Sequence, residues 1–129
     1  MSFKSQIGQF GEDKAAEFLA QQGFKILDRN YRKKWGEIDI VAQKDNSVHF
    51  VEVKTVTRAR TAVPGDDYEP EDNIHPWKRK RLRRAIETYL LAKEEEMGDN
   101  DWQVDVIAVY LDETSRTAWK IDWLQDEVI

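Results

Sequence analysis

The sequence contains no cysteine, which excludes disulfide bonds, thiolate nucleophiles and cysteine-ligated zinc. It has no apolar run approaching the roughly 20 residues that span a bilayer. Its first twenty residues include acidic side chains and lack the apolar stretch of a secretory signal. We therefore expect no membrane association. A cysteine-free chain suits a reducing compartment, and a cytoplasmic location is expected.

Two further kinds of site have no motif in the sequence. Gly8 and Gly11 are not followed by the Lys and Ser or Thr of a phosphate-binding loop. The two histidines, His49 and His75, show no partner spacing for zinc or for a catalytic triad. The sequence thus disfavours nucleotide hydrolysis and zinc chemistry.

The chain has 129 residues, 40% of them hydrophobic and 11% aromatic. This length suits one domain with its own core and is too short for two, so residues 1–129 are expected to form a single domain. The formal net charge of −5 argues against indiscriminate polyanion binding. The charges are unevenly placed, because residues 66–72 are mostly acidic and residues 78–84 are mostly basic.

Hydrophobic periodicity predicts the order helix, strand, strand, strand, helix, strand. The expected helices cover 8–22 and 76–97, and the expected core strands cover 24–31, 36–43, 48–55 and 103–111. Residues 56–73 lack periodicity and are expected to form an acidic loop, while 112–129 are expected to add an edge strand and a tail. This order indicates an α/β (α+β) fold with helices flanking a mixed central sheet.

Charged side chains interrupt two apolar strands of this predicted sheet. Asp39 interrupts one strand, and Glu52 and Lys54 interrupt the next. Because side chains alternate between the two faces of a strand, Ile38 and Ile40 are expected on one face and Asp39 on the other. A hairpin between these strands would bring Asp39 close to Glu52 and Lys54.

Such a group of side chains suits a divalent metal. Two neighbouring carboxylates repel each other, and Mg²⁺ or Mn²⁺ relieves the repulsion because these cations prefer oxygen ligands. The backbone carbonyl of Val53 is a third candidate ligand, and Lys54 adds a positive charge beside the site. The alternative interpretation is an exposed sheet face on which Glu and Lys alternate without a function.

A wider set of residues resembles the YraN-like family of bacterial proteins, which is grouped with the PD-(D/E)xK nucleases and Holliday-junction resolvases. The matching positions, spread over residues 8–110, are Gly8, Gly11, Glu12, Ala15, Gly23, Ile26, Leu27, Asn30, Arg32, 36–42, 50–54, Lys78, Arg81, Leu82, Ala85, Tyr89, Leu90, Asp105, Val106, Ala108 and Val109. The resemblance implies a restriction-endonuclease-like core. It also implies a role for Asp39 and Glu52 as metal ligands, for Lys54 as the catalytic lysine, and for Glu12 as an outer metal ligand.

The sequence departs from the family pattern at two places. The family often has a basic residue two positions after the catalytic lysine, where this chain has Val56. The loop that follows is usually short and glycine-bearing, whereas here it carries the acidic stretch 65–73. An acidic segment over the site would repel a phosphate backbone.

The basic run at the start of the second predicted helix is a candidate phosphate-binding surface. We expect phosphate contacts from Lys78, Arg79, Lys80 and Arg83. The alternative is a solvated helix face whose charges pair with the acidic loop and with the acidic run 94–96. Trp77 is more readily explained by packing than by stacking on bases.

These features predict a Mg²⁺- or Mn²⁺-dependent nuclease that hydrolyses phosphodiester bonds in DNA, including branched or repair intermediates. Two alternatives stay open: a non-catalytic nucleic-acid-binding module that keeps the nuclease fold, and a protein-interaction domain that works through its acidic loop. Because many such nucleases cut with two active sites, a homodimer is also expected, although the sequence does not locate its interface.

Overall fold

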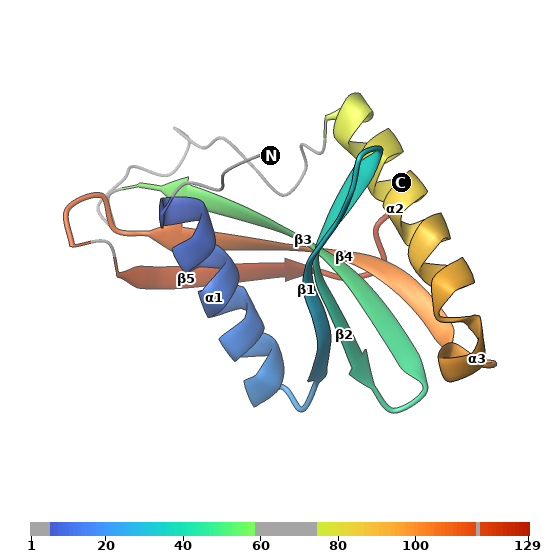
Figure 1. The fold of residues 1–129 in the computed structure, drawn as a ribbon. Helices are drawn as coiled ribbons and strands as arrows, with labels where there is room; N and C mark the ends of the chain where they lie inside the picture. Colours follow the sequence, from blue (N-terminus) through green and yellow to red (C-terminus); the bar gives the residue numbers. More distant parts are fainter. Residues whose placement is uncertain (1–5, 59–74, 116) are drawn as a thin grey trace.

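A computed structural model describes residues 6–58, 75–115 and 117–129 (Figure 1). Two longer helices and one short helix accompany five strands. The helices are α1 (Gln6–Gln21), α2 (Pro76–Ala92) and α3 (Glu94–Met97), and the strands are β1 (Lys25–Lys33), β2 (Gly36–Lys44), β3 (Ser47–Thr57), β4 (Asp101–Leu111) and β5 (Ala118–Leu124). Among the described helices, none is long and apolar enough to cross a bilayer.

The five strands form one sheet in the order β1-β2-β3-β4-β5. β3 and β4 are parallel, and the other three neighbouring pairs are antiparallel. Because a parallel pair needs a crossover connection, the chain between β3 and β4 passes through α2. This mixed sheet with flanking helices confirms the predicted α+β class and its restriction-endonuclease-like core.

The helices pack on opposite faces of the sheet, each over its own hydrophobic core. Under α1 lies a cluster that includes Ile40, Val51 and Ile107. Under α2 lies a second cluster that includes Ile38 and Phe50. Neighbouring strand residues that belong to different clusters, such as Phe50 and Val51, show that the two cores lie on the two sides of β3.

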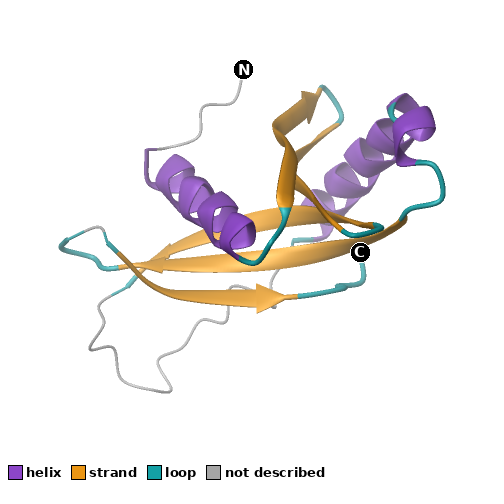
Figure 2. Ribbon diagram, turned by 90° about the horizontal axis from the view of Figure 1, so that it is seen from below, coloured by secondary structure: helices purple, strands orange, loops and turns teal. Residues whose placement is uncertain are grey.

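β2 is bent where it leaves β3. It pairs with β3 only from Ile40 to Lys44, although its pairing with β1 continues back to Gly36. Figure 2 shows the β1–β2 hairpin rising out of the layer of long strands, between the two helices. The prediction that Ile38 and Ile40 share a face is wrong, because this bend directs Ile38 to the α2 core and Ile40 to the α1 core.

Gly36 allows the raised end of the hairpin to lie directly against α2. A Cβ atom at Gly36 would stand 1.9 Å from the backbone carbonyl oxygen of Arg81, a separation that no side chain tolerates. Arg81 also donates a hydrogen bond to the Lys34 carbonyl at 3.5 Å. The glycine therefore sets how closely α2, and the side chains on it, approach β2.

Two predicted boundaries differ from the structure. The expected helix 76–97 is divided at Lys93, whose φ and ψ of −112° and 18° are not helical, and Glu94–Met97 forms a separate short turn. The acidic loop was expected from Val56, but β3 continues to Thr57 because its pairing with β4 extends to Leu111. The rest of that loop, residues 59–73, lies outside the described residues.

Candidate active site

The predicted acidic pair is brought together on β2 and β3. Asp39 is 6% exposed and Glu52 is 7% exposed, so both charged side chains are buried. Oδ2 of Asp39 accepts a hydrogen bond of 2.8 Å from the backbone N–H of Val53. The charge of Asp39 also acts on the Glu52 carboxyl group, so the two buried acids interact.

The bond from Val53 to Asp39 fills a gap in the sheet. In a continued antiparallel ladder the partner of Val53 would be Ile38, but β2 has already turned away at that point. The Asp39 carboxylate accepts the hydrogen bond of the Val53 N–H, which the backbone of β2 no longer reaches. Because the N–H and C=O of one strand residue point to the same side, the Val53 carbonyl also points toward this gap.

Glu52 is a strongly perturbed acid. Burial, followed by the neighbouring Asp39 charge, raises the pKa of Glu52 from its ordinary value of 4.5 to about 7. The ammonium of Lys78 opposes that shift, since its Nζ lies 2.9 Å from Oε1 of Glu52. A single lysine thus offsets only part of the unfavourable charge in this site.

Lys54 lies two residues after Glu52 and therefore on the same face of β3. Burial, together with the positive charge of Lys78, lowers the pKa of Lys54, while Glu52 acts in the opposite direction. Two lysines and two carboxyl groups consequently interact in one site. A lysine with a lowered pKa transfers protons more readily near neutral pH than an exposed one does.

The structure places Lys78 at the acidic pair, and its predicted phosphate binding stays a prediction. Although burial lowers the pKa of Lys78, the Glu52 carboxylate and its hydrogen bond raise it overall. The helical spacing already contained this information, because Lys78 lies four residues before Leu82 and seven before Ala85. Both of those residues are buried against the sheet, so Lys78 belongs to the same helix face.

The other three predicted phosphate-binding residues point elsewhere. Arg79 and Lys80 are exposed at the start of α2. Arg83 is exposed too, but its guanidinium donates a hydrogen bond of 2.7 Å to the Ile129 carbonyl oxygen. Arg83 therefore has a structural partner at the end of the chain, whereas Arg79 and Lys80 lie on the solvent side of the helix. Phosphate binding by these residues stays a prediction.

Glu12 lies on the other side of the sheet from Glu52. It is 1% exposed and lies in α1 next to Gly11, whose position in the helix brings it against Thr55 of β3. Its Oε1 is 3.4 Å from the guanidinium of Arg29, which also binds Asp13. Glu12 thus takes part in a partly buried ion pair with Arg29 of β1, and its predicted role as an outer metal ligand is not tested by this geometry.

The donor set suits a hard cation that keeps part of its water shell. Within residues 6–58, 75–115 and 117–129, no three Asp, Glu, His or Cys side chains gather to hold a metal. Asp39, Glu52 and the Val53 carbonyl would therefore be the protein ligands. Mg²⁺ usually binds through one or two carboxylates and several waters, so the residues present fit this ion.

A second buried polar cluster joins β3, β4 and β5, and no sequence motif predicted it. Nδ1 of His49 lies 2.6 Å from Oδ2 of Asp105, and Nε2 of His49 lies 3.2 Å from the Ser47 hydroxyl. Three further donors complete the carboxylate of Asp105: the Trp123 indole, the Gln103 amide and the Asp126 backbone N–H. The order serine, histidine, aspartate resembles that of a triad, but Asp105 is saturated with donors that tie three strands and the C-terminal segment together.

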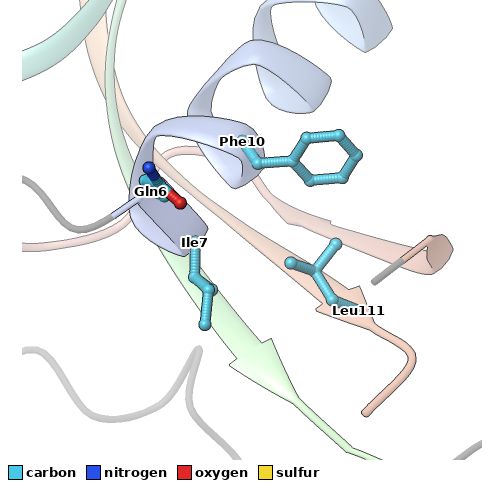
Figure 3. A pocket seen from close by; sticks show the side chains of 4 residues that line it. All are labelled: Gln6, Ile7, Phe10 and Leu111. Atoms are coloured by element: carbon cyan, nitrogen blue, oxygen red, sulfur yellow. The ribbon is translucent and has the colours of Figure 1, made fainter. Parts of the chain in front are cut away.

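A shallow apolar hollow of about 210 Å³ lies at the start of α1 (Figure 3). It is lined by Gln6, Ile7, Phe10 and Leu111. Of these four residues, Gln6 is polar and the other three are apolar, and none of the four is titratable. The chemistry of the described chain is therefore concentrated at Asp39, Glu52, Lys54 and Lys78.

Comparison with known proteins gives the family. The model of the uncharacterised protein family UPF0102 matches residues 11–109. A UPF0102 protein of Campylobacter jejuni is 40% identical over 102 residues, covering 79% of this chain and 81% of the relative. A UPF0102 protein of Flavobacterium psychrophilum is 36% identical over 126 residues, covering 98% and 96%. This chain therefore belongs to the UPF0102 family, the YraN-like family that its sequence pattern predicted.

Proposed function

We propose that this protein is a Mg²⁺- or Mn²⁺-dependent nuclease that hydrolyses phosphodiester bonds in DNA. The observation that carries the proposal is the pair of buried, interacting carboxyl groups of Asp39 and Glu52, with Lys54 and Lys78 beside them. A fold maintains such an arrangement at a loss of stability, and perturbed titratable groups of this kind cluster at functional sites.

A divalent cation would complete the charge balance of the site. With both acids ionised, two negative charges share a buried location, and Lys78 neutralises one of them. Asp39, Glu52 and the Val53 carbonyl would hold the cation. When bound, it lowers the pKa of a coordinated water and neutralises charge on a phosphate.

The lysines supply positive charge where negative charge develops during phosphodiester cleavage. Lys54 is half-buried, and an ammonium group in a partly dehydrated site stabilises an anion more strongly than it does in water. Its lowered pKa also suits it to exchange a proton with the attacking water. Lys78 would be released from Glu52 when Glu52 binds the metal cation. The Lys78 ammonium would then be available to a phosphate oxygen.

DNA is the proposed substrate, with branched or repair intermediates as the first structures to test. Arg79 and Lys80 lie exposed at the end of α2 that carries Lys78, so they extend positive charge outward from the site. The related proteins are bacterial, and bacterial DNA lies in the cytoplasm, which is the location that we propose for this chain.

The Lys78–Glu52 ion pair favours one alternative, a nucleic-acid-binding module without turnover. An acid that already has a lysine partner at 2.9 Å is partly neutralised in the absence of metal. In that case the fold would bind nucleic acid through α2, and the acidic pair would be a remnant that the lysine stabilises.

A cleavage assay separates these two functions. Linear, flapped and four-way DNA would be incubated with the protein in Mg²⁺, in Mn²⁺ and in chelator, beside the Asp39→Asn variant as a matched negative control. Cleavage that requires metal and Asp39 supports the nuclease. Binding of the same DNAs without cleavage under any metal condition would select the non-catalytic module instead.

A further inference from the structure

The tip of the β1–β2 hairpin is basic and aromatic. Residues 32–35 have the sequence Arg-Lys-Lys-Trp, and all four side chains are exposed. Figure 1 shows this tip beside α2. The Trp35 indole N–H donates a hydrogen bond of 2.9 Å to the Thr88 hydroxyl on α2, and Arg81 of α2 donates a longer one to the Lys34 carbonyl. The tip therefore has a defined position against the helix.

Trp35 has the features of a stacking platform. Its side chain is 41% exposed, while the polar edge of its ring is held by the hydrogen bond to Thr88. The Thr88 hydroxyl in turn donates a hydrogen bond of 3.0 Å to the Arg84 carbonyl. A ring that is already oriented loses little conformational entropy when a planar group stacks on it. Nucleobases are such groups, because every base has a π-face.

Positive charges lie on both sides of this tryptophan. Lys33 and Lys34 precede it in the hairpin, and both are exposed. Arg81 and Arg84 lie on the side of α2 that carries Thr88, because helix residues three or four positions apart are neighbours. Together these residues form what we call the hairpin surface: Lys33, Lys34, Trp35, Arg81 and Arg84.

Two nearby glutamates do not cancel these charges. Glu37 of the hairpin pairs with Arg32 at 3.3 Å, and neither belongs to the hairpin surface. Glu87 precedes Thr88 by one residue, so its side chain projects about 100° away around the helix. Four basic side chains beside an oriented aromatic ring match the phosphates and bases of a nucleic-acid strand.

The hairpin surface leads into the candidate active site along two elements. On β2, Asp39 follows Trp35 by four residues, which span at most about 13 Å at a rise of about 3.3 Å per residue. On α2, Lys78, which contacts Glu52, lies nearly one helical turn before Arg81. A stacked strand of DNA advances about 3.4 Å per nucleotide. A base at Trp35 would therefore lie within a few nucleotides of a phosphate at the acidic pair.

We propose that the hairpin surface binds a single-stranded segment of the DNA substrate, with one nucleobase stacked on Trp35 and the flanking phosphates on the four basic side chains. Bases inside a duplex stack on one another, so a side chain reaches a base face only where the duplex is open. The contact selects DNA with a single-stranded segment next to the cleaved phosphate, as in a flap, an overhang or a branch point. This inference rests on the proposed nuclease function and names the substrate class of its site.

Binding measured in chelator tests the inference without cleavage. Fluorescence anisotropy would compare a labelled single-stranded DNA, a duplex with a single-stranded overhang and a blunt duplex. Wild type is expected to bind the first two about tenfold more tightly than the blunt duplex, and Trp35→Ala is expected to lose about tenfold in affinity for them. Trp102→Ala is the matched control, because it removes a tryptophan of similar exposure, 47%, from β4. The control should bind like wild type.

Two milder variants separate stacking from a general loss of structure. Trp35→Phe keeps a ring but loses the hydrogen bond to Thr88, and Thr88→Val keeps the tryptophan but removes its partner. Both are expected to lie between wild type and Trp35→Ala in affinity for single-stranded DNA, and melting temperatures check that each variant folds. Equal binding by Trp35→Ala and wild type, or a blunt duplex bound as tightly as the overhang, would overturn the proposal.

The salt dependence of binding tests the basic side chains. Lys34→Ala and Arg84→Ala are each expected to reduce the slope of log affinity against log salt by about 0.7 for single-stranded DNA. Lys25→Ala, an exposed position at the other end of the hairpin, should leave the slope unchanged. Slopes like that of wild type in all three variants would contradict phosphate binding at this surface.

Failure of this inference is distinguishable from failure of the nuclease proposal. Metal-dependent cleavage with unchanged DNA binding by Trp35→Ala would keep the nuclease and overturn the hairpin surface. Binding of single-stranded DNA that depends on Trp35, without cleavage under any metal condition, would keep the surface and exclude the nuclease. Tighter binding of a single-stranded RNA of the same sequence would overturn DNA as the ligand. Binding of neither would overturn the proposal in favour of an acidic protein segment.

Discussion

The molecule buries carboxyl groups in two places, and their surroundings differ sharply. Asp105 accepts hydrogen bonds from His49, Trp123, Gln103 and a backbone amide, so both of its oxygens are satisfied. Glu52 has a lysine on one side and a second carboxyl group on the other. A buried acid supplied with donors holds strands together, whereas a buried acid set against another acid retains an unmet demand for positive charge. That difference distinguishes the structural cluster from the candidate active site.

The largest expected effect is on stability, at the structural cluster. Asp105→Ala leaves four donors without their acceptor and is expected to lower the free energy of unfolding by about 3–5 kcal/mol. Glu52→Gln removes an unfavourable buried charge, and the variant is expected to be at least as stable as wild type at neutral pH without metal. Urea denaturation of both variants measures the contrast. Equal destabilisation by the two substitutions would mean that Asp105 and Glu52 contribute alike to the stability of the fold.

The second prediction concerns catalysis by Lys54. Lys54→Ala is expected to reduce the rate of DNA cleavage about a hundredfold to a thousandfold, because it removes a positive charge that acts where negative charge develops. Affinity for metal should be unchanged or slightly higher, since a neighbouring cation is gone. Single-turnover cleavage and metal titration would be measured on the same preparation. Lys120→Ala, at an exposed strand position, is the control, and equal cleavage by Lys54→Ala would show that the site is assigned wrongly.

The third prediction concerns metal binding. Mg²⁺ or Mn²⁺ is expected to raise the melting temperature of wild type, because a ligand that binds only the folded state stabilises it. The double variant Asp39→Asn, Glu52→Gln should lose this increase while keeping its fold. Thermal melts with and without each ion give the answer, and circular dichroism checks the fold. An undiminished increase in the double variant would place the ions elsewhere.

The fourth prediction concerns pH. The folded-state pKa of Glu52, about 7, lies above its ordinary value of 4.5, so the folded protein holds this proton more tightly than the unfolded chain. The resulting stability is fully present below about pH 4.5 and is lost as the pH rises to about 7. In metal-free buffer the melting temperature of wild type should therefore fall across this window more than that of Glu52→Gln. Parallel curves for the two proteins would rule out the titration of Glu52 as the cause.

The smallest expected effect separates two arginines on α2. Arg79→Ala is expected to weaken DNA binding slightly and to reduce its salt dependence by about one counterion. Arg83→Ala is the matched comparison, because its guanidinium is held by the Ile129 carbonyl and should contribute less to binding. Affinity measured at several salt concentrations tests both. A larger loss from Arg83→Ala would reverse the assignment.

Much of the fold could be predicted, because strand and helix periods report which residues face a core. Those periods also bring Asp39 and Glu52 together, since adjacent strands joined by a short turn must pair. They failed at Ile38, because a period of two assumes an uninterrupted ladder, and β2 leaves β3 just before Ile40. A close contact between Gly36 and α2, which is far away in the sequence, accompanies that departure.

The Asp105 cluster shows a different limit. His49 and Asp105 are 56 positions apart and meet only because β3 and β4 pair in parallel, in a register that no local pattern determines. By contrast, the position of Lys78 on the buried face of α2 was readable from its spacing to Leu82. Its partner Glu52 was not, because the distance between helix and sheet depends on packing.

The hydrogen bond from the Val53 amide to Asp39 also makes that amide a reporter of motion at the site. Most amides in the middle of a sheet exchange with solvent deuterium only when strands separate, but this one is held by a side chain. A small movement of one carboxylate is enough to expose it. The exchange rate of this single amide would therefore report how often the Val53–Asp39 hydrogen bond breaks. A change in that rate on adding Mg²⁺ would be visible by NMR with no substrate present.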